Sequence, residues 1–357
     1  MKNQFFQSLL KIGVTRKQLL NPCMIVEICT RMIKLNPDDF AAYFNRANAK
    51  IHTGDTSGAI DDYDKGLSIN PTDVAALNNR GLAKATISKY LEAVKDYDQA
   101  IALDPGQKHP WFNRAIALRS SGNVQEAILD FTHVIEMDPK CMLAWFNRGV
   151  AKSMQGNSKG AIEDYSAVLK LSPNFALGYY YRGFDLYELG NFQEAIVNYN
   201  HALKLDQSLI EIYYNRGIAK LGLEDYKGSI IDQTKAIAVN PKFAEAYFNR
   251  AIAKFELADY EGALADNLEA VVLNPDFVEA YTNIGIIKFE TEELEEAMIS
   301  FEKAIEINPK YSRPWYNRGL LNLDLGNREE AIRDLQRAGE LGMRAAFDVL
   351  EEIRDEE

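Results

Sequence analysis

The sequence is poor in the residues that disulfide and metal chemistry require. It has three cysteines, Cys23, Cys29 and Cys141, and four histidines among 357 residues. An odd and sparse set of cysteines does not form a disulfide framework and is typical of a reduced, cytoplasmic protein. The histidines lie far apart, without the spacing of metal ligands. We therefore expect a cytoplasmic protein with no metal ion and no other cofactor.

Positive charge and long apolar runs are also scarce. The formal net charge is −12, which argues against nucleic-acid binding and against electrostatic attachment to a membrane. No apolar run approaches the roughly 18 residues of a membrane span. Gln7, Ser8 and Lys11 interrupt the first apolar stretch, so we expect no signal peptide. The sequence contains neither a glycine-rich phosphate loop nor a nucleophile elbow, and we expect no enzyme.

Proline is infrequent, with 11 residues in all, but most of it recurs at one spacing of 34 residues. Gln207 stands at the one missing position. The prolines in this register are Pro37, Pro71, Pro105, Pro139, Pro173, Pro241, Pro275 and Pro309. A fixed period of this length predicts an array of structural repeats.

A short motif of an aromatic residue, Asn and Arg follows the same period, as in "AWFNRGVAK" (Ala144 to Lys152). Tyr181 interrupts the asparagines and Ile284 interrupts the arginines. The asparagines are Asn45, Asn79, Asn113, Asn147, Asn215, Asn249, Asn283 and Asn317. The arginines are Arg46, Arg80, Arg114, Arg148, Arg182, Arg216, Arg250 and Arg318. The chain therefore aligns with itself over nine periods.

Each period predicts two helices. In residues 142–175, the first is expected at about Leu143 to Gln155 and ends at Gly156, since glycine tolerates the left-handed conformation that closes a helix. The second is expected from about Ser158 to Leu171 and ends before Pro173. Small residues recur on both helices and let their backbones approach closely. On the first helix they are Ala47, Gly81, Ala115, Gly149, Gly183, Gly217, Ala251, Gly285 and Gly319.

This order of aromatic, small and proline positions resembles the tetratricopeptide repeat family. The resemblance implies an all-α fold, a right-handed superhelical solenoid of helix hairpins. We expect nine full repeats over residues 40–342 and a degenerate N-terminal repeat or cap over residues 1–39. Residues 343–357 are expected to form a C-terminal capping helix with an acidic tail.

The arginine of the motif lies near the small-residue column and so faces the second helix. A half-buried arginine needs an acid, and the second helices supply one at a constant distance. These aspartates are Asp62, Asp96, Asp130, Asp164, Asp232, Asp266 and Asp334. Ser300 replaces the aspartate in the repeat where Ile284 replaces the arginine, which favours pairing within a repeat. The alternative is that the arginines contact a ligand.

The asparagine faces the other way, and the resemblance places it along a concave groove. A carboxamide both donates and accepts hydrogen bonds, so a row of asparagines suits the backbone of an extended peptide. We expect aromatic residues beside it in the groove. They are Phe112, Phe146, Tyr180, Tyr214 and Phe248. Alternatively, the asparagines bond neighbouring helices and the aromatics pack between repeats.

The groove is expected to be apolar in the early repeats and acidic in the later ones, where Glu211, Glu245 and Glu279 follow one column. We therefore predict a scaffold that binds a peptide or partner protein, with a basic portion facing the later repeats. Solvated acids on an acidic protein are the alternative. Other possible functions are a self-assembling solenoid, with a homo-oligomer, or a non-catalytic regulatory subunit of an enzyme. The apolar "FFQSLLKIGV" near the N-terminus could also occupy the groove.

Overall fold

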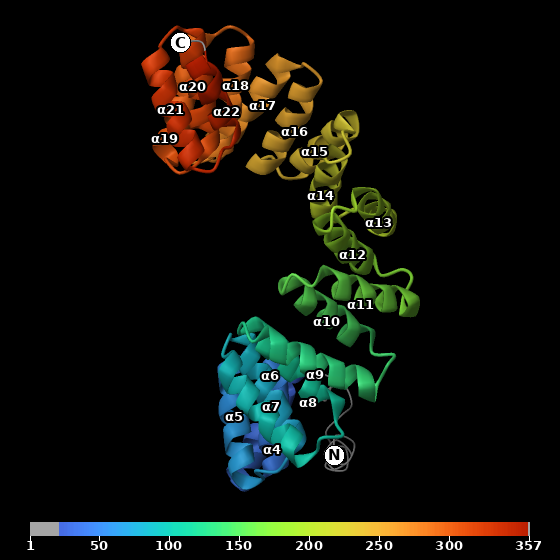
Figure 1. The fold of residues 1–357 in the computed structure, drawn as a ribbon. Coiled ribbons are helices and arrows are strands. Elements are labelled where there is room, and N and C mark those ends of the chain that lie inside the picture. Colours follow the sequence, from blue (N-terminus) through green and yellow to red (C-terminus); the bar gives the residue numbers. More distant parts are fainter. Residues whose placement is uncertain (1–20, 356–357) are drawn as a thin grey trace. The chain divides into compact units, whose positions relative to one another are not determined.

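The computed structural model describes residues 21–355, which form twenty α-helices and no strand. Sequential helices pack against each other as antiparallel hairpins (Figure 1). The helices are α3 (Pro22–Leu35), α4 (Phe40–His52), α5 (Thr56–Ile69), α6 (Val74–Thr86), α7 (Tyr90–Leu103), α8 (Lys108–Ser120), α9 (Val124–Met137), α10 (Met142–Met154), α11 (Ser158–Leu171), α12 (Ala176–Glu188), α13 (Phe192–Leu205), α14 (Ile210–Leu221), α15 (Tyr226–Val239), α16 (Ala244–Glu256), α17 (Tyr260–Leu273), α18 (Val278–Glu290), α19 (Leu294–Ile307), α20 (Ser312–Asp324), α21 (Arg328–Glu340) and α22 (Ala345–Asp355). The prediction of an all-α solenoid of helix hairpins is confirmed.

The chain divides into two compact units, residues 1–185 and residues 186–357, which we call unit 1 and unit 2. Within both units, the even-numbered helices from α4 to α20 are the first helices of their repeats, and the odd-numbered helices from α5 to α21 are the second. The "FFQSLLKIGV" segment lies outside the described residues. The expectation that this segment occupies the groove is therefore not tested.

One residue in each repeat has a positive φ, directly after the first helix, where the chain reverses. Five of these nine residues are glycines, at φ between 74° and 90°. The other four are Ser88, Glu224, Ala258 and Glu292, at φ of 59° to 62°. A side chain at such an angle brings Cβ close to the backbone carbonyl and costs about 1–2 kcal/mol. The geometry of the turn is therefore kept even where the sequence does not supply glycine.

The interior of each hairpin pairs a small residue on the first helix with a large one on the second. A Cβ atom on Gly149 would lie 2.7 Å from the ring of Tyr165, and one on Gly81 would lie 2.6 Å from the ring of Tyr97. Those rings are fully buried, as is Phe131. In unit 2 the same column holds two polar residues, Gln233 and Asn267, which are as deeply buried as the rings.

Seven arginines form two parallel hydrogen bonds with an aspartate sixteen residues later. In each pair, Nε and Nη2 donate to the two carboxylate oxygens over 2.5 to 3.0 Å. The aspartates are at most 5% exposed. The pairs are Arg46–Asp62, Arg80–Asp96, Arg114–Asp130, Arg148–Asp164, Arg216–Asp232, Arg250–Asp266 and Arg318–Asp334. Two-point contacts of this kind fix the relative position of two helices as well as their charges.

The same guanidinium groups also reach the preceding repeat. Arg114 donates from Nη1 to Asp98 over 2.6 Å, and Arg148 donates from Nη1 to Thr132 over 3.0 Å. The guanidinium group of Arg114 lies 4.7 Å from the ring centre of Trp111. Arg114 thus contacts its own helix, its partner helix and the previous second helix, and these contacts use its donors inside the protein.

A second cation, which the sequence did not lead us to expect, joins five of these aspartates. Lys152, four residues after Arg148, places Nζ 2.9 Å from Asp164 and donates to the carbonyl of Gly160. The equivalent lysines are Lys50, Lys84, Lys220 and Lys254. Leu118 stands at this position after Arg114. Within the described chain, Arg114 is therefore the cation paired with Asp130.

The two ends of the described chain bury apolar faces against the repeats. At one end, α3 packs on α4 and encloses Cys29, and burial raises the pKa of its thiol to about 12. At the other end, α22 buries Ala346, Leu350 and Ile353 against α21. The opposite face of α22 exposes acidic side chains. The N-terminal and C-terminal caps expected from the sequence include these two helices and stay predictions.

Arg114→Ala should destabilise the protein more than Arg148→Ala. The first variant leaves the buried Asp130 without a cation and should lose about 3 kcal/mol, at the lower end for a buried pair because the arginine is partly exposed. After the second, Lys152 still faces Asp164. Urea denaturation of both variants measures the difference. Equal losses would contradict this view of the pairing, as would no recovery in Arg114→Ile combined with Asp130→Ser.

Ala258→Gly should stabilise the protein by about 0.5–1 kcal/mol, since it removes the strain of a positive φ, and the greater entropy of the unfolded glycine chain offsets only part of that gain. Gly156→Ala, at the same position of another repeat, should destabilise it by about 1 kcal/mol. Urea denaturation of both variants measures these effects. The midpoint should rise for Ala258→Gly and fall for Gly156→Ala. A lower midpoint for Ala258→Gly would show that this turn is not strained.

Candidate functional site

The candidate site is the face of the first helices that carries the motif asparagines, which we call the first-helix face. It comprises the residues at −4, 0, +3 and +7 from each motif asparagine, or from Tyr181 on α12. Steps of four, three and four residues keep these side chains on one side of a helix. Successive first helices also contact each other at α4–α6, α6–α8 and α8–α10 in unit 1 and at α14–α16 and α18–α20 in unit 2. Their faces therefore adjoin from repeat to repeat.

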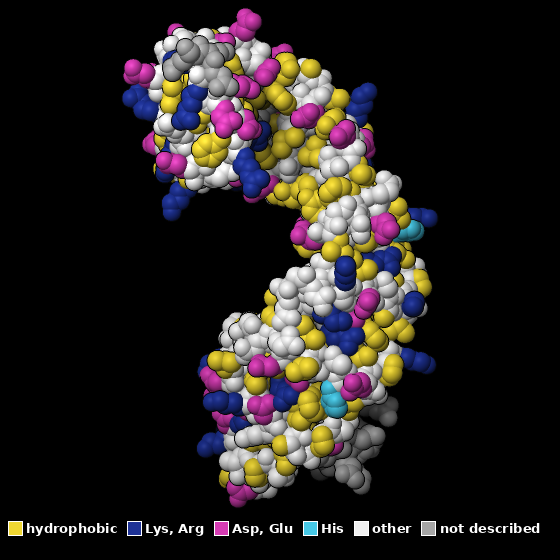
Figure 2. Space-filling view, in the orientation of Figure 1, with side chains coloured by type: hydrophobic (Ala, Val, Ile, Leu, Met, Phe, Trp, Pro, Cys, Tyr) yellow, Lys and Arg dark blue, Asp and Glu magenta, His cyan; other side chains and the backbone are white. Residues whose placement is uncertain are grey.

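In unit 1 the first-helix face exposes apolar side chains. Leu82 is 49% exposed, Leu143 50% and Met154 60%, and Leu177 and Phe184 on α12 are each more than one-third exposed. Apolar side chains also appear on the second helices, where Leu91 and Leu129 are 63% and 61% exposed. Figure 2 shows such side chains, in yellow, distributed among charged ones. Exposure alone therefore does not separate the two faces.

In unit 2 the first-helix face is acidic. The exposed acids are Glu211, Glu245, Glu256, Glu279, Glu290 and Asp324. Arg313, at −4 in the last repeat, is an exposed cation on the same face. The acidic side chains that the sequence places on this face of unit 2 are therefore exposed to solvent.

The motif asparagines lie at the seam between successive first helices and are half-buried, apart from Asn45, which is 8% exposed. Asn79 donates to Asn48 over 3.0 Å, and Asn113 donates to Asn78 over 2.9 Å, both across a repeat boundary. Asn45, Asn147 and Asn317 each donate to the carbonyl four residues earlier in their own helix. The chain itself therefore uses part of the hydrogen-bonding capacity of these carboxamides.

Three motif asparagines of unit 2, Asn215, Asn249 and Asn283, lie in other surroundings. Asn249 on α16 hydrogen-bonds Tyr214, and burial raises the pKa of that tyrosine while this bond opposes the shift. Asn215 lies half-buried on α14. Asn283 lines a pocket, described below. The motif asparagines therefore share the 34-residue period, but their hydrogen-bond partners differ from one repeat to the next.

The five aromatic residues expected beside the asparagines pack against other rings. Four of these contacts join the ring to the second helix or to the start of the next repeat. The contacts are Phe112–Phe131 at 5.7 Å, Phe146–Phe175 at 5.2 Å, Tyr180–Tyr181 at 5.2 Å, Tyr214–Phe243 at 4.6 Å and Phe248–Phe277 at 4.9 Å between ring centres. All five rings are half-buried. Three of these contacts join successive repeats, which supports the alternative of packing between repeats. A role of the rings in binding stays a prediction.

Arg119 is a site residue that the repeat pattern did not reveal, because other repeats have no arginine at this position. It is half-buried on α8 and donates from Nη1 to the Oδ1 atom of Asn147 over 2.9 Å. Burial lowers the pKa of its guanidinium group. Asn147 therefore stabilises a partly desolvated cation beside the first-helix face of unit 1.

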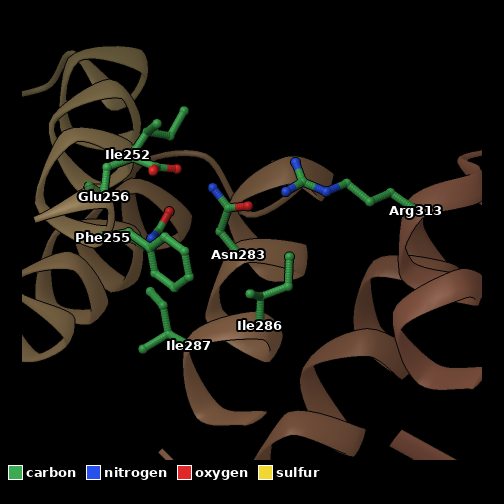
Figure 3. A pocket seen from close by; sticks show the side chains of 9 residues that line it. Ile252, Phe255, Glu256, Asn283, Ile286, Ile287 and Arg313 are labelled. Atoms are coloured by element: carbon green, nitrogen blue, oxygen red, sulfur yellow. The ribbon is translucent and has the colours of Figure 1, made fainter. Parts of the chain in front are cut away.

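A pocket of about 120 Å³ opens between α16, α17, α18 and α20 in unit 2 (Figure 3). Its walls include Ile252, Phe255, Ile286 and Ile287. Glu256, Asn283 and Arg313 belong to the first-helix face, and Asn267 comes from the second helix α17. In Figure 3 the carboxamide of Asn283 lies between the side chains of Glu256 and Arg313. The pocket thus combines apolar walls with several polar groups.

Residues 21–355 contain no group of three or more histidine, cysteine or acidic residues placed to hold a metal ion. In the same part of the chain, no helix is both long and apolar enough to cross a membrane.

Comparison with family models identifies the repeats. Models described as tetratricopeptide repeat match residues 40–73, 78–132, 112–176, 210–243, 278–311 and 300–333. A model described as TPR repeat matches residues 185–223. Together these matches cover more than half of the chain.

Solved structures show the same fold. A tetratricopeptide repeat protein from Parabacteroides merdae is 20% identical, with a TM-score of 0.53 over 74% of this chain and 98% of that one. The C-terminal part of a repeat protein from Cytophaga hutchinsonii is 17% identical, with a TM-score of 0.55 over 66% and 98%. YrrB, described as a TPR protein with an unusual peptide-binding site, is 22% identical, with a TM-score of 0.47 over 53% and 97%. No curated protein matches the chain.

Asn147→Ala should destabilise the protein by about 1 kcal/mol, because Arg119 loses its acceptor while remaining half-buried. Asn317→Ala is the matched control, since the bond that Asn317 donates runs to its own helix, where alanine is a good residue. It should change stability by less than about 0.5 kcal/mol. Thermal and urea denaturation measure both. Equal effects would show that the Arg119 contact contributes nothing.

Proposed function

The chain belongs to the tetratricopeptide repeat family, and on that premise we propose that it is a protein-binding scaffold whose first-helix face holds an extended segment of a partner. The observation that carries the proposal is the set of five exposed apolar side chains at the −4, +3 and +7 positions of the first-helix face in unit 1, namely Leu82, Leu143, Met154, Leu177 and Phe184. Water-exposed apolar groups that gather on one face are a common sign of a protein interface.

The apolar side chains supply affinity in this proposal. A few well-buried anchors carry most of the binding energy of an interface, and the surrounding contacts mainly exclude water. Leu143 and Met154 occupy the −4 and +7 positions of α10, on either side of Asn147. A partner lying across α10 would cover both side chains at once.

The asparagines supply contacts that do not depend on the partner's sequence. A carboxamide has two donor hydrogens and an oxygen that accepts two hydrogen bonds. Asn147 uses one donor for Leu143 and one acceptor position for Arg119. The capacity that remains suits the alternating N–H and C=O groups of an extended backbone.

The acids of unit 2 supply charge selectivity. The first-helix face there carries exposed carboxylates at both the −4 and the +7 positions. We infer that the portion of the partner held by unit 2 is basic. Attraction between exposed charges weakens as salt shortens the Debye length, from about 10 Å at 0.1 M to about 3 Å at 1 M. Affinity for such a partner should therefore fall with added salt.

Replacing the apolar side chains of the first-helix face should weaken binding, whereas the same change on the second helices should not. The test variant is Leu82→Ser, Leu143→Ser and Met154→Ser. The control is Leu91→Ser and Leu129→Ser, which removes side chains of at least equal exposure. Peptides selected by the wild-type chain from a display library of random 12-residue sequences serve as probes. Fluorescence anisotropy should show at least about tenfold weaker binding for the test variant, roughly the loss of one good anchor.

Two outcomes would contradict the proposal. Equal weakening in both variants would place binding elsewhere or make it non-specific. Selection of no peptide, together with an apparent mass by light scattering that rises with concentration, would favour self-assembly instead.

A further inference from the structure

The pocket in unit 2 lies where the second helix α17 departs from the repeat pattern. At the position of Asn267, six other repeats have a fully buried ring, which fills the space beneath the first helix. The rings are Tyr63, Tyr97, Phe131, Tyr165, Tyr199 and Phe301. Asparagine is shorter than any of these, and the space it leaves adjoins the walls formed by Ile252, Ile286 and Ile287. The pocket is therefore a local property of this repeat.

The lining contains a buried acceptor without a partner. Asn267 is 1% exposed, and its Nδ2 atom donates to the carbonyl of Ala263 over 3.1 Å. A carbonyl only accepts, so the nitrogen must face it and Oδ1 must point elsewhere. Among residues 21–355, no group hydrogen-bonds this Oδ1 atom. Leaving a buried acceptor unbonded is unfavourable, and a donor entering the pocket would satisfy it.

The size of the pocket restricts its occupant to one side chain. Sites for small molecules and cofactors usually enclose about 300–1,000 Å³, whereas this pocket has about 120 Å³. Its walls are apolar, which suits a side chain with a hydrocarbon stem. Its tip must carry a hydrogen-bond donor to satisfy Asn267.

Charge then selects among side chains of this shape. Glu256 contributes a carboxylate to the lining, and its neighbours on the first-helix face, Glu245, Glu279 and Glu290, are also exposed acids. A lysine has a stem of four methylene groups and an ammonium group with three donors. We propose that this pocket binds a lysine side chain of the segment held by the first-helix face. The inference rests on the proposed function and adds a specific residue to it.

Arg313 and Asn283 orient the segment that carries the lysine. Arg313 reaches from α20 toward Asn283, on the side away from Glu256 (Figure 3). Its guanidinium group repels a second cation and offers donors to a carbonyl or carboxylate. The lysine therefore enters beside Glu256, and the adjoining residue on the side of Arg313 is neutral or acidic.

The test uses the full-length chain and a display library of random 12-residue peptides. Peptides enriched on the wild-type chain should share a lysine at one position. In the tightest of them, replacing that lysine by norleucine keeps the stem and removes the ammonium group. Affinity for the wild-type chain should fall at least about tenfold, the equivalent of one good charge-assisted contact.

Asn267→Tyr fills the pocket with a residue that the chain uses at this position in other repeats. Alanine already faces Tyr63 and Phe131 at Ala47 and Ala115, so Ala251 should accommodate the new ring. On this variant the change from lysine to norleucine should alter affinity less than about twofold, because a coupled pair loses its interaction when either member is removed. Glu256→Gln should also reduce the preference. Glu290→Gln, the same position on the next first helix but outside the lining, is the control.

The possible results distinguish a failure of the pocket assignment from a failure of the proposed function. An equal effect of norleucine on the wild-type chain and on Asn267→Tyr would overturn the pocket assignment while leaving the scaffold function intact. Peptides without a shared lysine would do the same. No enriched peptide at all would overturn the proposed function, and the pocket with it. If circular dichroism shows that Asn267→Tyr does not fold, the comparison of Glu256→Gln with Glu290→Gln decides alone.

Discussion

A charged pair held by two parallel hydrogen bonds positions the helices of this protein. Each buried aspartate would be unfavourable without a cation, and the arginine sixteen residues earlier supplies it from the neighbouring helix. Because the planar guanidinium group meets the carboxylate at two points, it fixes the orientation of the helices as well as their distance. Its remaining nitrogen reaches the preceding repeat. One side chain thus links three helices, and the first-helix face takes its direction from that linkage.

The sequence predicted those features that recur with the period. Pro173, Gly156 and the Arg148–Asp164 spacing each have counterparts in other repeats, so comparison within the chain separates pattern from chance. Helix α10 begins and ends within one residue of its expected bounds. The positive φ of Ala258 was not foreseen, because no residue type marks it. The turn is imposed by the packing of the two helices it connects, which overrides the local preference of alanine.

Features of single repeats were predicted less well. Arg119 occurs in one repeat only, and nothing in the sequence showed that it would meet Asn147. Lys152 shares the aspartate of Arg148 because the two residues are four apart and lie on one helix face, a geometry that the sequence spacing already contains. The aromatic residues beside the asparagines were ambiguous, since a ring at a repeat boundary is suited both to packing and to binding. The ring contacts show the packing role, and the binding role stays a prediction.

The arginine links constrain how such a chain can change in length. Arg114 contacts one residue sixteen positions before it and another sixteen positions after it. Duplicating or removing a whole 34-residue block keeps both spacings at every junction, whereas a gain or loss inside a hairpin shifts one of them and leaves a carboxylate without its cation. The length of this chain is therefore expected to change by whole 34-residue repeats. The number of hairpins can vary between descendants of one ancestral array, while the internal dimensions of a hairpin stay nearly fixed.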